Sequence, residues 1–174
     1  MNLFLWGALP YIAFTFLIVG TLVRFFYFER NWTTKSSEFL EKKQLRIANP
    51  LFHFGLLCVI GGHVVGVLVP KAWTAAMGIN DHMYHEGALY MGAVAGIIFI
   101  VGFLLLMKRR FTVPAMKVNT SGFDKWLYLF LTLAIFSGMA GTLLNASGFF
   151  DYRVSIGPWF RSLLSFMPDP SLME

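Results

Sequence analysis

Apolar residues gather in four long uncharged stretches, and the segments between them carry most of the charge. The stretches run over residues 3–23, 51–69, 87–107 and 126–146. Each is about 20 residues long, and at about 1.5 Å of rise per residue a helix of this length crosses the roughly 30 Å hydrocarbon core of a bilayer. The pattern therefore predicts four transmembrane helices.

Two shorter helical patterns lie outside these stretches. Apolar residues recur at helical spacing near the C-terminus, with Ser155 as N-cap and Pro158 in the first turn. The pattern predicts a helix over about 155–167, too short to span, that lies in the membrane interface. A short surface helix is also expected in the polar segment that begins at Ser36 and includes Phe39 and Leu40.

Composition supports this interpretation. Of the 174 residues, 57% are hydrophobic and 13% charged, against about 45–50% and about 25% in soluble domains. These values exclude an ordinary soluble globule, a disordered chain and a secreted disulfide scaffold. The single cysteine, Cys58, cannot form an internal disulfide and is interpreted as a small buried hydrophobe. The sequence predicts an all-α integral membrane helical bundle forming a single membrane domain over 1–174.

The distribution of positive charge predicts the orientation. Eleven of the fourteen Lys and Arg residues lie in two inter-span segments, 24–46 and 108–125. Basic residues next to span ends stay cytoplasmic, so both segments should lie inside and the N-terminus outside. The net charge of +5 is thus an orientation signal, and no nucleic acid partner is expected. A docking surface for an acidic cytoplasmic partner remains open.

The second apolar stretch contains two histidines, His53 and His63. A ten-residue separation gives about 15 Å of rise and an angular offset of roughly 80°, so both rings project from one side at two depths. The two residues are too far apart to share one iron, but each could ligate a separate haem. Packing or proton-relay roles stay open. Gly55, Gly62 and Gly66 form a stripe that predicts close helix packing.

Motifs spread over the whole chain resemble one family. They are "PYIAF" at Pro10–Phe14, Arg24, Trp32, Ser36–Ser37, "NPLFHFG" and "GGHVVGVLVP" around His53 and His63, "KRR" at Lys108–Arg110 and "TSGFD" at Thr120–Asp124. With these motifs the chain resembles the gamma subunit of respiratory nitrate reductase, a dihaem cytochrome b membrane subunit.

This resemblance implies five transmembrane helices that hold two b-type haems by bis-histidine ligation. His53 would ligate the haem nearer the cytoplasm and His63 the haem nearer the outer face, and Arg110 is the candidate partner of a haem propionate. The family's remaining two ligands lie on a fifth helix beyond Glu174. The expectation is a C-terminally truncated chain with half of each axial set, inactive alone, whose haem retention stays open.

The resemblance also implies a function in the bacterial inner or plasma membrane. Quinol, either menaquinol or ubiquinol, would be oxidised near the outer haem and release its protons outside. Electrons would then pass inward to an iron–sulfur beta subunit and a molybdenum-containing alpha subunit, which reduces nitrate to nitrite. The alternatives are a dihaem quinone-linked subunit of another reductase complex and a haem-free membrane anchor or transporter.

The outer loop before the third stretch holds the candidate quinol residues His82, Tyr84 and His85. A histidine accepts a proton near neutral pH and could hydrogen-bond a quinol hydroxyl. The alternative interpretation is a set of polar residues at the start of an interfacial helix. A zinc site needs three or four convergent ligands, and the neighbouring acids at Asp81 and Glu86 do not supply them.

Overall fold

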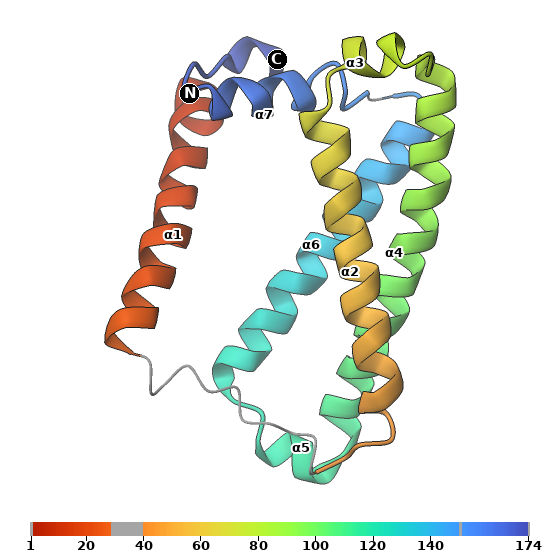
Figure 1. The fold of residues 1–174 in the computed structure, drawn as a ribbon. Coiled ribbons are helices and arrows are strands. Elements are labelled where there is room, and N and C mark those ends of the chain that lie inside the picture. Colours follow the sequence, from red (N-terminus) through yellow and green to blue (C-terminus); the bar gives the residue numbers. More distant parts are fainter. Residues whose placement is uncertain (1, 29–39, 150, 174) are drawn as a thin grey trace. The chain divides into compact units, whose positions relative to one another are not determined.

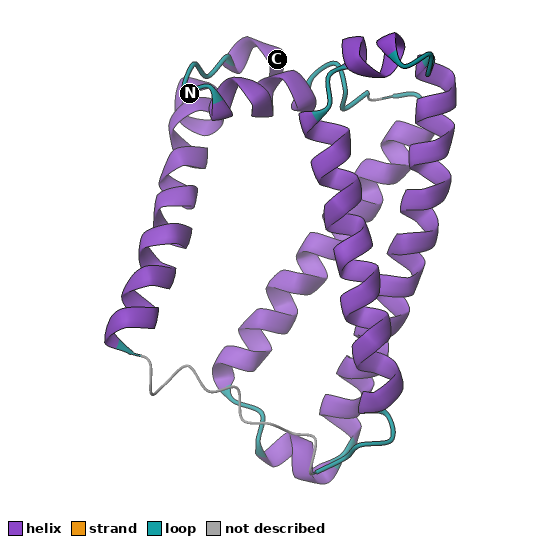
Figure 2. Ribbon diagram, viewed as in Figure 1, coloured by secondary structure: helices purple, strands orange, loops and turns teal. Residues whose placement is uncertain are grey.

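The computed structural model describes residues 2–28, 40–149 and 151–173, and these residues form helices, turns and loops with no strand (Figure 2). Four helices are long and apolar enough to cross a membrane: Leu3–Tyr27, Leu45–Leu68, Asp81–Thr112 and Gly122–Ala146. They confirm the four predicted spans and the all-α class. The chain divides into two compact units, residues 1–36 with 152–174 and residues 37–151, and each is described by itself.

The first unit joins the two ends of the chain. A π-helical turn, η1 (Leu3–Ala8), continues into α1 (Leu9–Tyr27), and the C-terminal part forms α7 (Ile156–Leu164) and a short 3-10 helix, η3 (Pro170–Met173). In Figure 1, α7 lies across one end of α1. The indole Nε1 of Trp159 donates to the carbonyl oxygen of Trp6 at 2.8 Å, so this non-spanning helix is fastened to the first span.

The helix α7 is shorter than the predicted segment. It ends at Leu164, and Phe166 has a φ of 58°. A residue in this left-handed region ends a helix, which explains why the apolar pattern continues to Met167 while the helix does not. Ser155 is the N-cap residue, as predicted, but its side chain makes no capping hydrogen bond.

The second unit contains the helices that carry the candidate site. They are α2 (Leu45–Leu68), α3 (Lys71–Ala76), α4 (Asp81–Thr112), α5 (Pro114–Val118) and α6 (Gly122–Ala146). Helices α2 and α4 run antiparallel and side by side, and α6 is inclined to both (Figure 1). The short helices α3 and α5, at opposite ends of this unit, were not predicted.

Two glycines bring α2 and α4 into backbone contact. A Cβ atom added to Gly55 of α2 would lie 2.5 Å from the backbone nitrogen of Phe99, and one added to Gly102 of α4 would collide with the backbone of Phe52. The predicted packing role of the glycine stripe is therefore confirmed at Gly55, which is buried. It is wrong at Gly62, where an added Cβ meets nothing within 4 Å.

Cys58 corrects a second expectation. Its side chain is exposed rather than buried, although it lies in the middle of α2. An apolar sequence position in a membrane helix does not by itself indicate contact with another helix, because lipid accepts apolar side chains as well as protein does.

The helices extend beyond the apolar stretches because capping residues, not hydrophobicity, set their ends. The Asn80 side chain accepts a hydrogen bond from Met83 at the start of α4. Ser121 and Asp124 form a capping box at the start of α6. The predicted surface helix from Ser36 lies outside the described residues up to Phe39, as do Trp32 and Ser36–Ser37. The rest of that segment contradicts the prediction, because residues 40–44 form turns and loop and the next helix, α2, begins only at Leu45.

Candidate functional site

Both histidines of α2 make the same hydrogen bond with the backbone of the preceding turn. Nδ1 of His53 lies 2.9 Å from the carbonyl oxygen of Asn49, and Nδ1 of His63 lies 2.7 Å from that of Val59. A carbonyl oxygen only accepts, so this contact requires a proton on Nδ1, and the neutral ring in that tautomer has its lone pair on Nε2. Metal-bound histidines usually donate their other ring N–H in this way.

The surroundings of the two rings leave room for a large planar ligand. Both side chains are exposed in the chain. Gly61 and Gly62 directly precede His63, and an added Cβ at either position meets nothing within 4 Å. The ring of Phe52 stands nearly perpendicular to that of His53, with centroids 5.1 Å apart. Each exposed imidazole fits a ligand to a haem iron, and at His63 the two preceding glycines also leave the adjoining helix surface open.

Each histidine offers a single ligand. In the part of the chain that the structure describes, no three His, Cys, Asp or Glu side chains come together in an arrangement that could hold a metal ion. A metal held by this chain through His53 or His63 would therefore need further ligands from the cofactor or from elsewhere, as a haem iron does.

Arg110, the candidate propionate partner, is held at the α5 end of the second unit. Its Nε donates to the hydroxyl oxygen of Tyr128 at 3.3 Å, and its Nη2 lies 3.7 Å from Oδ1 of Asp124. The guanidinium carbon is 6.0 Å from the centroid of the Tyr128 ring. Sequence reasoning singled out Arg110 but missed both partners. The Ser121 to Asp124 capping spacing was the available signal.

The neighbouring Arg109 does something different. It is buried, its Nε donates to Oε2 of Glu41 at 2.7 Å, and its Nη2 donates to the backbone oxygen of Glu41 at 2.5 Å. The backbone nitrogen of Gln44 donates to Oε1 of Glu41 at 2.7 Å, and this hydrogen bond is the main cause that lowers the pKa of Glu41. Burial raises that pKa, whereas the contacts with Arg109 lower it further. The pair ties the entry to α2 to the end of α4.

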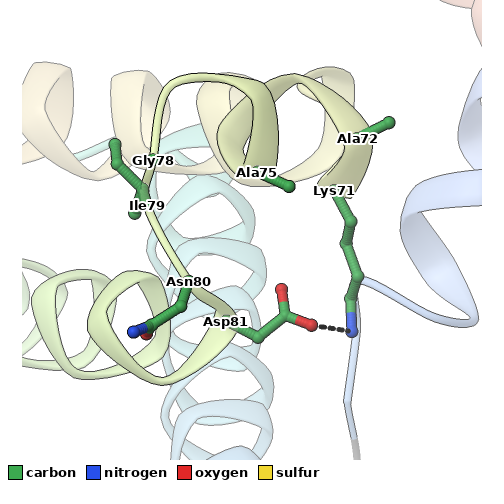
Figure 3. A pocket seen from close by; sticks show the side chains of 7 residues that line it. All are labelled: Lys71, Ala72, Ala75, Gly78, Ile79, Asn80 and Asp81. Atoms are coloured by element: carbon green, nitrogen blue, oxygen red, sulfur yellow. Dashed lines mark ion pairs between the residues drawn. The ribbon is translucent and has the colours of Figure 1, made fainter.

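The opposite end of this unit holds a second charged cluster, beside a surface pocket of about 430 Å³ between α3 and the start of α4. The Lys71 ammonium lies 2.9 Å from Asp151 and 3.4 Å from Asp81, and Figure 3 shows the pair with Asp81 at the pocket. The hydrogen bond to Asp151 is the main cause that raises the pKa of Lys71. The cluster joins α3, α4 and the segment after α6.

The candidate quinol residues lie on the first two turns of α4, as the helix-start interpretation predicted. Nε2 of His82 is 3.6 Å from Oε1 of Glu86, and the His82 side chain is 80% exposed. Tyr84 and His85 are half-buried. The contact between Gly55 and Phe99 sets the level of α2 against α4, and by that alignment His85 lies about 9 Å nearer the α3 end than His63.

Comparison with known proteins decides the family. The family model for the nitrate reductase gamma subunit matches residues 2–174. The chain belongs to the nitrate reductase gamma subunit family. Together with its four apolar helices, this membership makes the chain a membrane subunit of the nitrate reductase type.

Curated relatives agree with this family. The nitrate reductase gamma chain of Bacillus subtilis (strain 168) is 46% identical over 171 residues, which cover 98% of this chain and 77% of the relative. The respiratory nitrate reductase 1 gamma chain of Escherichia coli (strain K12) is 31% identical over 82% of this chain and 62% of its own length. The nitrate reductase-like protein NarX of Mycobacterium tuberculosis is 39% identical, but only 26% of its length is covered.

Proposed function

We propose that this chain transfers electrons within a nitrate reductase complex, from quinol oxidised near the outer membrane face to iron–sulfur and molybdenum subunits on the cytoplasmic face. The observation that carries the proposal is the pair of Nδ1 hydrogen bonds at His53 and His63. These bonds fix the tautomer that leaves Nε2 of each ring available to an iron. The family of the chain supports the choice of reductase.

In this proposal the two histidines hold two b-type haems, one each. Haem, when bound, supplies a one-electron carrier. The histidines set the positions of the two haems. His53 and His63 are ten residues apart, which is about 15 Å along the axis of α2, and the helix crosses a hydrocarbon core of about 30 Å. The backbone carbonyls of Asn49 and Val59 restrain the orientation of the two rings.

The basic end of the second unit is proposed to face the cytoplasm. Exposed cations cluster around α5 and the start of α2, at Lys42, Lys43, Arg46, Lys108, Lys117 and Lys125. Positive residues next to span ends favour the cytoplasmic side. His53 is then the inner ligand and His63 the outer one, and the exposed cations supply the surface that docks the iron–sulfur and molybdenum subunits.

Quinol oxidation is proposed at the start of α4, on the outer side. Oxidation of a quinol releases two electrons and two protons, so the site needs a group that accepts a hydrogen bond and a proton near neutral pH. His85 and Tyr84 are half-buried, whereas His82 is exposed and lies beside Glu86. His85 therefore carries this part of the proposal, with Tyr84 and His82 as its neighbours.

The proposal is tested by following electron flow through the assembled complex in native membranes. Quinol should reduce the b-type haems and nitrate should reoxidise them. In His63→Ala, quinol should no longer reduce the inner haem. In His53→Ala, quinol should still reduce the outer haem, but nitrate should fail to reoxidise it. Cys58→Ala, an exposed position on the same helix, is the matched control and should behave as wild type.

Two results would contradict the proposal. Absence of any b-type haem signal in the wild-type complex would favour a haem-free anchor or transporter. Haems that nitrate cannot reoxidise, but another oxidised substrate such as sulfite or a heterodisulfide can, would assign the chain to a different quinone-linked reductase.

A further inference from the structure

Three side chains from two helices meet at the α5 end of the second unit. Arg110 comes from the last turn of α4, and Asp124 and Tyr128 come from the first two turns of α6. The Arg110 side chain is 19% exposed and that of Asp124 30%. Asp124 and Tyr128 are four residues apart, so they share one face of α6 and contact the same guanidinium.

The carboxylate of Asp124 is itself fixed in place. Its Oδ2 accepts hydrogen bonds from the backbone nitrogen and the hydroxyl of Ser121, at 2.8 Å and 3.0 Å. In return, the Ser121 hydroxyl accepts from the backbone nitrogen of Asp124 at 3.2 Å. The capping box thus commits one oxygen to Ser121 and leaves Oδ1 facing Arg110.

The contacts of Arg110 leave part of its donor set uncommitted. A guanidinium has five N–H donors in a rigid plane. Tyr128 accepts from Nε, and Asp124 lies nearest to Nη2. Within the described part of the chain, Nη1 makes no hydrogen bond. Tyr128 and Asp124 both lie along the Nε–Nη2 edge of the guanidinium. They therefore set the orientation of its plane and leave the edge that contains Nη1 available to another partner.

The place of Arg110 relates it to the His53 end of α2. Phe103 lies two helical turns before Arg110 on the same side of α4, and its ring centroid is 6.4 Å from that of Phe52 and 6.3 Å from that of Tyr128. The backbone of Gly102 abuts that of Phe52. Arg110 therefore lies about 12 Å beyond the level of Phe52, toward the α5 end.

We propose that Asp124 and Tyr128 are positioning residues that orient Arg110 toward a carboxylate of the haem held by His53. The inference rests on the proposed function, because it needs an anionic ligand anchored at His53. Haem b carries two carboxylate groups on one edge, and a planar guanidinium pairs with a carboxylate through two parallel hydrogen bonds. Neither Asp124 nor Tyr128 contacts the cofactor; each acts through Arg110.

The electrostatics of reduction give this arrangement a measurable consequence. An electron added to a haem is stabilised by a nearby fixed positive charge, so an oriented Arg110 raises the reduction potential of the inner haem. Release of Arg110 from Tyr128 moves that charge away and lowers the potential. Tyr128→Phe changes no charge of its own, so any shift it produces comes through Arg110 or through packing.

The test is a redox titration of both b-type haems in the assembled complex, with haem content as the readout of folding. Tyr128→Phe and Arg110→Gln should each lower the potential of the inner haem and leave the outer haem unchanged. Tyr128→Phe should have no further effect in an Arg110→Gln background, as a double-mutant cycle requires of a residue that acts through another. Thr112→Val, which removes an exposed hydroxyl two residues beyond Arg110, should leave both potentials unchanged.

Asp124→Asn is a second variant, and it distinguishes two roles of Asp124 because they predict opposite shifts in the reduction potential of the inner haem. If Asp124 positions Arg110, its loss lowers the inner potential; if it acts only as a nearby negative charge, its loss raises that potential. A rise in Asp124→Asn, no shift in Tyr128→Phe, or an equal shift with and without Arg110 would overturn the inference. Failure of His53→Ala to remove the inner haem would instead contradict the proposed function.

Discussion

Nδ1 of His63 lies 2.7 Å from the carbonyl oxygen of Val59, one helical turn earlier in α2. The same relation, at 2.9 Å, holds between His53 and Asn49. A helix carbonyl four residues back already accepts its own backbone hydrogen bond, and its second lone pair can take a side-chain donor. Each ring is thereby held against its helix with Nε2 directed away from the bonded carbonyl.

Close packing of α2 on α4 predicts that Gly102 tolerates no side chain. Gly102→Ala places a Cβ against the backbone of Phe52, and overpacking of this kind costs about 2 kcal/mol. Thermal unfolding of the detergent-solubilised complex, followed by loss of haem absorbance, should show a lower Tm. Gly92→Ala, where nothing lies within 4 Å of the added Cβ, is the matched control. Equal Tm values for the two variants would contradict the packing account.

The pair of Glu41 and Arg109 predicts an acid-sensitive link between the entry to α2 and the end of α4. The pKa of Glu41 is lowered chiefly by the hydrogen bond from the Gln44 backbone. A lowered carboxyl pKa contributes stability above the ordinary glutamate value, and this stability is lost as pH falls through the lowered pKa.

Glu41→Gln should therefore lower the Tm at neutral pH, because it removes the carboxylate that pairs with the buried Arg109. The gap between this variant and wild type should close in acid, below the ordinary pKa of a glutamate. Tm measured across a pH series checks this. A gap that stays constant from neutral to acid pH would show that the carboxylate charge is irrelevant.

The cluster around Lys71 predicts a local rather than a global effect. Lys71→Met removes the ion pairs with Asp151 and Asp81 that join α3, α4 and the segment after α6. Backbone amides of residues 71–82 should exchange faster with deuterium, while those in the middle of α2 and α4 should not change. Lys117→Met, an exposed lysine of α5, should leave exchange over 71–82 at the wild-type rate. Unaltered exchange over residues 71–82 in Lys71→Met would show that the ion pairs of Lys71 do not stabilise this end of the unit.

Quinol oxidation should depend more on His85 than on His82. His85 is half-buried, whereas the His82 side chain is 80% exposed beside Glu86. His85→Gln keeps a polar side chain but removes the imidazole proposed to take the quinol proton, so quinol-dependent haem reduction should slow roughly 100-fold or more. His82→Gln should have a much smaller effect. Unchanged quinol oxidation in both variants would exclude these histidines from the site.

The sequence was sufficient to predict the spans but not the contacts between them. Uncharged stretches of about 20 residues identify transmembrane helices because a bilayer requires that length. The helices α4 and α6 begin earlier than predicted, because Asn80 and Ser121 cap them before their apolar stretches begin. The helix α3 was missed because six residues between two longer helices show little periodicity.

The charged pairs show the limit of sequence reasoning more sharply. Glu41 and Arg109 are 68 residues apart, and Lys71 and Asp151 are 80 apart. Only the folded chain brings such residues together. Arg109 and Arg110 are adjacent in the sequence, yet a helix turns about 100° per residue, so one is buried against Glu41 and the other faces α6. The candidate histidines were found because two polar rings in an apolar helix are costly.

The most direct test of the account is the number of b-type haems that the chain holds in its assembled complex when each histidine is replaced. Haem content per complex and reduced-minus-oxidised spectra should give two b-type haems in wild type and one in each of His53→Ala and His63→Ala, with different potentials for the two that remain. Retention of both haems in either variant, or their complete absence from wild type, would contradict the assignment of one haem to each histidine.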